Sequence, residues 1–180
     1  KIVGLVVLVL LLGSATPPIE SLHGSRKDRS SEELKLYTEA LSALIIRSDT
    51  SQTQQLTDKV LAIDSMHTPS IILQARIAKT PLGRWQLYER ALRSDPKNAF
   101  AREQAAEAAL RANQQKRAIE LFGTMADTTS NLEIIYRLAM IHTLSGSFDK
   151  SLALLDTLDV RFGYSEATSK MRQHIFKSHG

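Results

Sequence analysis

The chain has no cysteine and few aromatic residues. Among its 180 residues none is Cys, 6% are aromatic, and eight Gly and five Pro fall mostly between helix-like runs. Without thiols this chain has no disulfides, no thiolate metal sites and no cysteine nucleophile. The shortage of aromatic residues also leaves little of the material that strands prefer, although 43% of the residues are hydrophobic. The composition therefore favours an all-α protein.

The charge is only slightly unbalanced. The chain carries 23 Lys and Arg against 19 Asp and Glu, a net charge of +4. Without the first fifteen residues the balance is 22 against 19, or +3. Such a small excess does not require a nucleic-acid or anionic-lipid partner, and we expect no nucleic-acid binding. The basic cluster at Arg26, Lys27 and Arg29 is typical of a solvated linker.

The N-terminus resembles a targeting segment. Lys1 precedes eleven apolar residues, 2–12, and Gly13-Ser14-Ala15 follows with small residues where a signal peptidase cleaves. Eleven residues span about 16 Å as a helix, roughly half of a bilayer core. Residues 1–15 are therefore predicted to be a signal peptide, with an uncleaved N-terminal anchor as the alternative. Either way we expect export to a bacterial periplasm or cell envelope, with membrane contact only through this segment if it stays uncleaved.

Polar turns recur at nearly constant spacing in the rest of the chain. Gly146 and Gly180 stand at positions i and i+34, and each closes a Ser-containing turn after a helix-like run. The same turn is predicted at Asn113 and Gly83, so that the successive spacings from Gly83 are 30, 33 and 34. A period of about 34 residues is typical of a helix-turn-helix repeat.

Pairs of small residues support this period. Ala106 and Ala118 stand at positions i and i+12, and so do Ala139 and Ser151. Each pair has one member inside a first helix and the other near the start of a second. Because two helices can approach closely only where both carry small side chains, we expect the two helices to cross at each pair.

The stretch from Trp85 to Ala99, WQLYERALRSDPKNA, resembles the second helix of a tetratricopeptide repeat and its Asp-Pro junction into the next repeat. The chain departs from the family pattern at Ala109 and His142, where a large aromatic residue is usual. The resemblance implies an all-α, TPR-like α-solenoid of antiparallel helix pairs that forms a right-handed superhelix. Trp85 and Tyr88 are expected to be packing residues.

Helix boundaries follow from caps and periodicity. Ser30 with Glu33 and Ser130 with Glu133 have the spacing of capping boxes, and Thr68-Pro69 has proline where a helix loses no amide bond. The predicted helices are about 31–47, 52–63, 69–79, 84–94, 99–112, 115–126, 132–144, 148–161 and 166–178. After a linker at 16–29 with two prolines, the helical domain at 30–180 has predicted repeats at about 34–67, 68–98, 99–131 and 132–165, and the start of another at 166–180.

The last predicted helix has no second helix after it. As an unpaired amphipathic helix it would expose Met171, Ile175 and Phe176. Two explanations remain open: the helix is a solvating cap of the repeat array, or it is the first half of a hairpin whose other half lies beyond Gly180.

Catalytic patterns are absent from the sequence. Asp156 and Asp159 share a helix without an evident acid–base partner and are expected on a solvated face. There is no glycine-rich phosphate loop and no nucleophile elbow. The histidines lack metal-ligand spacing and are expected at the surface or in turns; they are His23, His67, His142, His174 and His179. We therefore expect no enzyme activity, no metal and no cofactor.

The family resemblance implies a binding site on the concave surface, which the first helices line. The positions carried over are Ile72, Arg76, Lys79, Phe100, Glu103, Glu107, Arg111, Tyr136, Met140 and Thr143. Similar repeats that clamp a C-terminal carboxylate use Asn and basic residues there. Glu103 and Glu107 would repel that group, so such a clamp is not expected. Arg76 and Lys79 beside these acids suit an extended or helical peptide of mixed charge.

Two functions remain open at this stage. The first is a non-catalytic scaffold of the cell envelope that binds a protein or peptide on its concave face. The second is the ligand-sensing or capture part of a longer chain whose regulatory or enzymatic module lies beyond residue 180. The identity of the partner cannot be derived from the residues.

Overall fold

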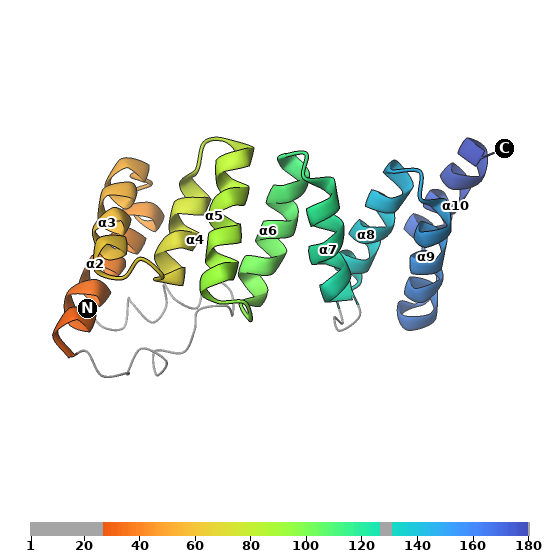
Figure 1. Ribbon diagram of the computed structural model, residues 1–180. Helices are drawn as coiled ribbons and strands as arrows, with labels where there is room; N and C mark the ends of the chain where they lie inside the picture. The colour runs from red at the N-terminus through yellow and green to blue at the C-terminus, as the bar shows by residue number, and fades with distance from the viewer. Residues whose placement is uncertain (1–26, 127–130, 180) are drawn as a thin grey trace. The chain divides into compact units, whose positions relative to one another are not determined.

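The computed structural model describes residues 27–126 and 131–179 (Figure 1). Within these ranges the chain forms helices and short connections and contains no strand, which confirms the all-α class. The helices are α2 (Lys27–Ile45), α3 (Thr50–Ile63), α4 (Thr68–Ile77), α5 (Pro81–Ser94), α6 (Ala99–Arg111), α7 (Gln115–Ala126), α8 (Leu132–Leu144), α9 (Phe148–Phe162) and α10 (Glu166–His179). The predicted signal peptide or anchor and most of the predicted linker lie outside the described residues.

Each of the predicted helices corresponds to an observed one. Four of the starts differ, two of them by three residues or more. Helix α2 begins at Lys27, so the end of the predicted linker is helical and Ser30 lies inside the helix instead of capping it. Helix α5 begins at Pro81 because Thr80 caps it, accepting a hydrogen bond from the amide of Gly83 at 3.1 Å. The turn predicted at Gly83 is therefore wrong, since this glycine lies in the first turn of α5.

Side-chain caps set most of the other helix starts. Asp49 accepts from the amide of Gln52 at 2.8 Å at the start of α3, and Asn98 accepts from that of Ala101 at 2.9 Å at the start of α6. At α8 the cap is Asn131, whose side chain accepts from the amide of Glu133 at 3.0 Å. The sequence placed this cap one residue earlier, at Ser130, which lies outside the described residues. Each cap satisfies an amide that has no partner within its helix.

Two of the predicted turns have the backbone that their residues favour. Asn113 has φ of 57° and Gly146 has φ of 73°, both in the left-handed region that Gly and Asn adopt most readily. Asn113 follows α6 and Gly146 follows α8, so both turns are confirmed. The fourth, at Gly180, lies outside the described residues, and α10 continues through His179.

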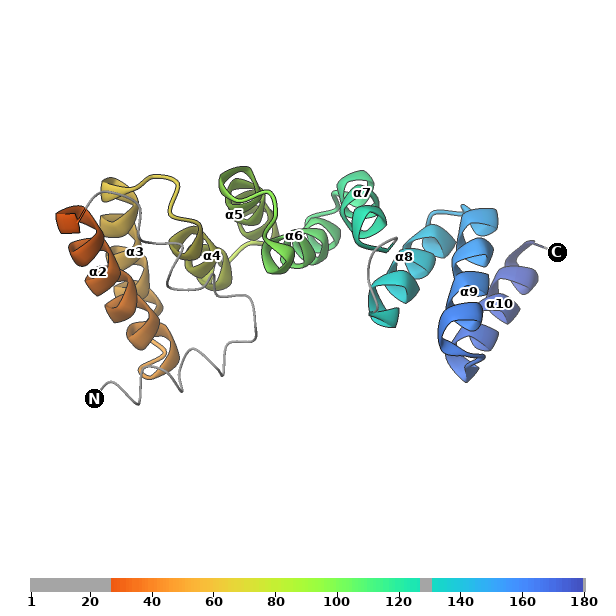
Figure 2. The ribbon, with the colours of Figure 1, turned by 90° about the horizontal axis from the view of Figure 1, so that it is seen from below.

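The chain divides into two compact units, 1–112 and 113–180, so the boundary falls inside the predicted repeat 99–131. In the first unit α2 packs on α3, α3 on α4, α4 on α5 and α5 on α6 (Figures 1 and 2). One apolar core cluster joins α2, α3 and α4 through Ala40, Leu41, Leu56 and Leu73. Ala106 and Ala118 are both fully buried; because they belong to different units, their crossing stays a prediction.

In the second unit α7 packs on α8, α8 on α9, and α10 on both α8 and α9. The small pair predicted for this hairpin is in contact, because the Ser151 hydroxyl donates to the carbonyl oxygen of Ala139 at 2.9 Å. Both residues are fully buried. The close crossing of α8 and α9 is thus confirmed at this pair.

Helix α10 is covered on one face. Met171 and Ile175 are 9% and 1% exposed, whereas Phe176 is 64% exposed. The expectation that all three would be exposed is therefore correct only for Phe176. Burial of these two side chains on the side that packs on α8 and α9 contributes to holding the helix in place.

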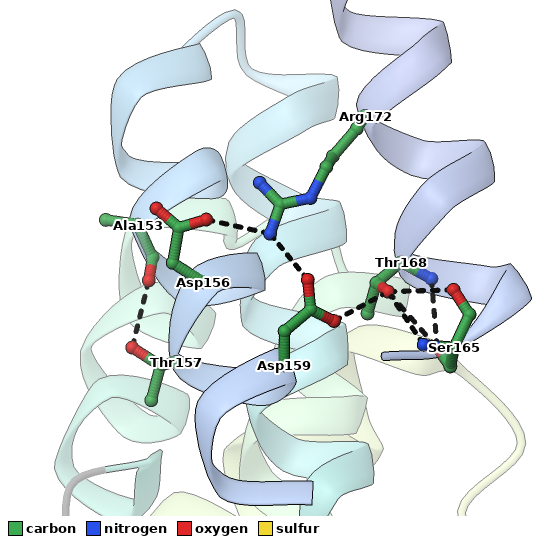
Figure 3. Close-up of polar contacts among 7 residues, drawn as sticks. All are labelled: Ala153, Asp156, Thr157, Asp159, Ser165, Thr168 and Arg172. Atoms are coloured by element: carbon green, nitrogen blue, oxygen red, sulfur yellow. Dashed lines mark hydrogen bonds and ion pairs between the residues drawn. The ribbon is translucent and has the colours of Figure 1, made fainter. Parts of the chain in front are cut away.

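Polar contacts also join α10 to α9 (Figure 3). Nη2 of Arg172 lies 2.8 Å from an oxygen of Asp156 and 2.8 Å from one of Asp159. The hydroxyl of Thr168 donates to the other oxygen of Asp159 at 2.8 Å. We expected both aspartates on a solvated face. Instead they share the guanidinium of Arg172 from the next helix.

Among the helices of the described ranges, none is long and apolar enough to span a membrane.

Candidate functional site

A small polar hollow lies among three helices of the first unit, with a volume of about 160 Å³. Helix α4 contributes one residue, α5 two and α6 four. The lining residues are Arg76, Arg84, Tyr88, Gln104, Glu107, Ala108 and Arg111. In Figure 2 α4 and α6 lie on one side and α5 on the other. The hollow is lined by three guanidinium groups and one carboxylate, so its charge is positive.

Helix α4 is short, and Arg76 lies in its last turn. His67 caps that helix, accepting from the amide of Ser70, and Pro69 follows at its beginning. This confirms the start predicted at Thr68-Pro69. At the other end the guanidinium carbon of Arg76 lies 5.4 Å from the centre of the Phe100 ring. Such a cation–π contact restricts the guanidinium before any ligand arrives.

Helix α5 contributes Arg84 and Tyr88, one turn apart on the same face. Nη2 of Arg84 donates to the carbonyl oxygen of Ala78, just after α4, at 2.9 Å. Its Nε is buried and has no hydrogen-bond partner among the described residues. A buried donor without a partner costs about 1–3 kcal/mol, and this one belongs to a residue that lines the hollow.

Tyr88 forms the buried wall of the hollow, with only 2% of its surface exposed, as expected for a packing residue. Burial raises its pKa, while the positive charges of Arg76, Arg84 and Arg111, together with a hydrogen bond from Arg76, act in the opposite direction. The phenol therefore stays protonated near neutral pH. All three guanidinium groups lie close enough to affect this one hydroxyl.

Helix α6 contributes the acidic part of the lining. Nη2 of Arg111 lies 3.9 Å from an oxygen of Glu107, and the two side chains are 62% and 18% exposed. An ion pair this long and this exposed contributes little to stability. Gln104 lies one turn before Ala108 on the same helix, and its amide adds both a donor and an acceptor.

Three of the residues predicted for the concave face line this hollow: Arg76, Glu107 and Arg111. Phe100 packs beside Arg76. Ile72, Lys79 and Glu103 belong to the same unit but lie outside the lining; Ile72 and Glu103 are half-buried and Lys79 is exposed.

The predicted residues of α8 belong to the other unit. Tyr136 is half-buried and Met140 is 38% exposed. Thr143 is buried, and its hydroxyl lies 2.7 Å from that of Ser151. Thr143 is therefore a packing residue of the α8–α9 hairpin, which does not suit the partner-contacting role predicted for it.

The sequence patterns do not predict Arg84, Gln104 or the polar end of Tyr88 as site residues. The first and last lie on α5, a second helix in the predicted repeats, whereas the resemblance implied a site made by first helices. The i, i+4 spacing of Arg84 and Tyr88 was the available signal. It indicates a shared helix face but does not say what that face meets.

A second polar cluster surrounds His67, which is 7% exposed. Its Nδ1 lies 2.9 Å from the hydroxyl of Ser70, and its Nε2 lies 3.4 Å from an oxygen of Glu33. The chain of contacts from Ser70 through His67 to Glu33 resembles a hydrolase triad. However, Ser70 is fully buried, and Nδ1 of His67 also accepts a hydrogen bond from the backbone amide of Ser70. We assign the cluster to capping of α4. His67 is buried but lies in the turn between α3 and α4, as expected, whereas His142 is buried inside α8, so the surface or turn position expected for the histidines is wrong for His142.

Within residues 27–126 and 131–179, no group of three or more His, Asp or Glu residues could hold a metal ion. No model of a known protein family matches the chain, and no curated protein matches it. The tetratricopeptide resemblance therefore stays a prediction from the residues.

Proposed function

We propose that the chain is a TPR-like α-solenoid of antiparallel helix pairs, a right-handed superhelix, that acts as a non-catalytic scaffold and binds a protein or peptide. Two kinds of observation support it. Within each unit, helices that follow one another in sequence pack together. The Asp-Pro junction also folds as the resemblance implies: Asp95 ends α5, and Asn98 begins α6 three residues later.

The observation that carries the proposal is the convergence of Arg76, Glu107 and Arg111 on one open hollow. The family resemblance implies partner-binding positions at these three residues, which come from two helices. Both signs of charge are present, and the ring of Phe100 lies beside them. Such a surface suits a peptide that offers charged and apolar side chains in alternation.

The proposed place of action is the periplasm or cell envelope. This part rests on the apolar run at 2–12 and the small residues at 13–15, all outside the described residues. Mass spectrometry of the protein recovered from its own cells tests it. Thr16 at the N-terminus supports export, and recovery of residues 2–12 intact in a membrane fraction supports the anchor.

Selection from a random peptide library tests the binding function. The 180-residue chain is immobilised, and the selected peptides are mapped by the amide shifts that they cause. Binding should shift residues of α4, α5 and α6, and Arg111→Glu should weaken it. Arg93→Glu is the matched control, because Arg93 is exposed on α5 and does not line the hollow. A failure to select any peptide that maps to these helices would overturn the proposal.

A further inference from the structure

Like charges are concentrated in the hollow. Arg76, Arg84 and Arg111 bring three positive charges around the hydroxyl of Tyr88, and Glu107 brings a single negative charge to the lining. Guanidinium groups held this close repel one another, and the repulsion is strongest where water is partly excluded. A bound anion would relieve it.

Residues of the lining also carry hydrogen-bond donors that suit oxygen atoms. Nε of Arg84 is buried without a partner among the described residues, whereas Nη2 of the same group is held by Ala78. The guanidinium is therefore fixed on one side, while its Nε–H has no acceptor among the described residues. The neutral hydroxyl of Tyr88 and the amide of Gln104 lie in the same lining. Planar guanidinium groups bind carboxylate and phosphate oxygens in pairs, which gives such sites their geometric selectivity.

We propose that this hollow binds an oxyanion group, a carboxylate or a phosphate, carried by the peptide that the scaffold captures. The inference rests on the proposed function and specifies its ligand chemistry. It also revises the expectation that the acids of α6 would exclude a carboxylate. Only Glu107 reaches the lining, while Arg84, from α5, adds a cation that the sequence did not place there.

Simple probes test this with the 180-residue chain at constant ionic strength. The Nε–H signal of Arg84 is followed by NMR during titration with inorganic phosphate, blocked hexaglutamate and blocked hexaglutamine. Phosphate and hexaglutamate should shift the signal, and hexaglutamine should not. A blocked hexaglutamine with one phosphoserine distinguishes the sources. Tighter binding of this peptide than of hexaglutamate assigns the hollow to phosphate, and the reverse assigns it to carboxylate.

Variants separate a site from general attraction between charges. Arg84→Met keeps the aliphatic stem and should weaken hexaglutamate binding about tenfold or more. Arg111→Met, at a side chain that is 62% exposed, should weaken it without affecting folding. Arg93→Met changes the net charge equally, but outside the hollow, and should have little effect. Equal losses in all three variants, or no shift at Arg84 with either anion, would overturn the inference.

The outcomes also separate this inference from the proposed function. If library peptides bind α4 to α6 but carry no acidic group and ignore Arg84→Met, the scaffold function stands and the oxyanion site falls. If phosphate and hexaglutamate bind at Arg84 but no library peptide binds, the hollow takes up small anions and the scaffold function falls.

Discussion

The hydroxyl of Ser151 in α9 donates a hydrogen bond to the carbonyl oxygen of Ala139 in α8 at 2.9 Å. Both residues are fully buried, and the hydroxyl of Thr143 lies 2.7 Å from that of Ser151. The backbone of one helix is thus reached directly by a side chain of the other. Only a small residue at each position permits this approach, which is why an i, i+12 pair of small residues in the sequence marks the crossing.

Ser151→Ala should destabilise the chain by about 1–2 kcal/mol. The substitution removes a buried hydroxyl that bonds to the carbonyl oxygen of Ala139 and to the hydroxyl of Thr143. Urea unfolding followed by circular dichroism measures it. Thr157→Ala is the control, because its hydroxyl bonds only within α9, to Ala153, at the exposed side (Figure 3), and should change stability by less than about 0.5 kcal/mol. Equal effects of the two changes would argue against a close crossing.

Most of the fold could be predicted from the sequence because the helices of this chain end at local signals. The starts predicted at Thr68-Pro69 and Ala99, and the left-handed turns at Asn113 and Gly146, depend on residues within a few positions of where they stand. The errors have the same origin. At α5 the sequence offers Thr80 and Gly83 within four residues, and Thr80 caps the helix, so Gly83 lies in its first turn and not in the expected turn.

The candidate site was only half predictable. Arg76, Glu107 and Arg111 were implied by the resemblance to tetratricopeptide repeats, but the role of Arg84 depends on how α5 lies against α4 and α6. Its Nη2 donates to the carbonyl oxygen of Ala78, in the short connection between α4 and α5. The burial of Thr143 likewise depends on the partner helix. Sequence periodicity gives the face of a helix, but not the residues that this face meets.

The glycines offer a pair of opposite predictions. Gly123→Ala should stabilise the chain by about 0.5–1 kcal/mol, because this glycine lies inside α7 and an added Cβ would meet no atom within 4 Å. Gly146→Ala should destabilise by about 1–2 kcal/mol, because φ is 73° there although the space is equally open. The midpoints of urea unfolding of both variants, compared with that of the wild type, test these two predictions. Stabilisation by both would show that the turn after α8 does not need a left-handed residue.

His67 should make stability depend on pH. Burial lowers its pKa, against the opposing charge of Asp64; burial and then Asp64 raise the pKa of Glu33. Although Glu33 lies 3.4 Å from the ring, burial of both groups favours their neutral forms. A lowered histidine pKa means that the unfolded chain binds more protons. The stability is therefore complete above about pH 6.5 and declines as pH falls through that value toward the folded pKa.

Urea unfolding from about pH 7.5 to about pH 5.5 tests this with His67→Asn, which keeps a capping side chain but cannot titrate. The variant should lose less stability over this interval than the wild type. The raised pKa of Glu33 has the opposite effect on stability, because its contribution is complete below about pH 4.5 and is lost as pH rises above that value. His174→Asn, at an exposed residue of α10, should follow the wild type. An unchanged slope in His67→Asn would show that the buried ring does not contribute to it.

Arg172 should control how firmly α10 is held on α9. Hydrogen bonds from Arg172 and Thr168 lower the pKa of Asp159, which stays ionised near neutral pH. Arg172→Met keeps the stem but removes both 2.8 Å contacts with Asp156 and Asp159. Amide protection across 166–179, measured by hydrogen exchange, should fall by about fivefold or less, because partly exposed ion pairs contribute little and the buried Met171 and Ile175 remain.

Two comparisons show whether that change comes from this network. Lys170→Met breaks only the exposed contact with Glu166 at 2.6 Å and should leave protection unchanged. A carboxyl with a lowered pKa stabilises above its unfolded value, and that stabilisation is lost as pH falls through the folded pKa. The difference between wild type and Arg172→Met should therefore shrink below about pH 3.8. If it persists there, or if Lys170→Met has the same effect, α10 is held by its apolar face alone and Arg172 only covers it.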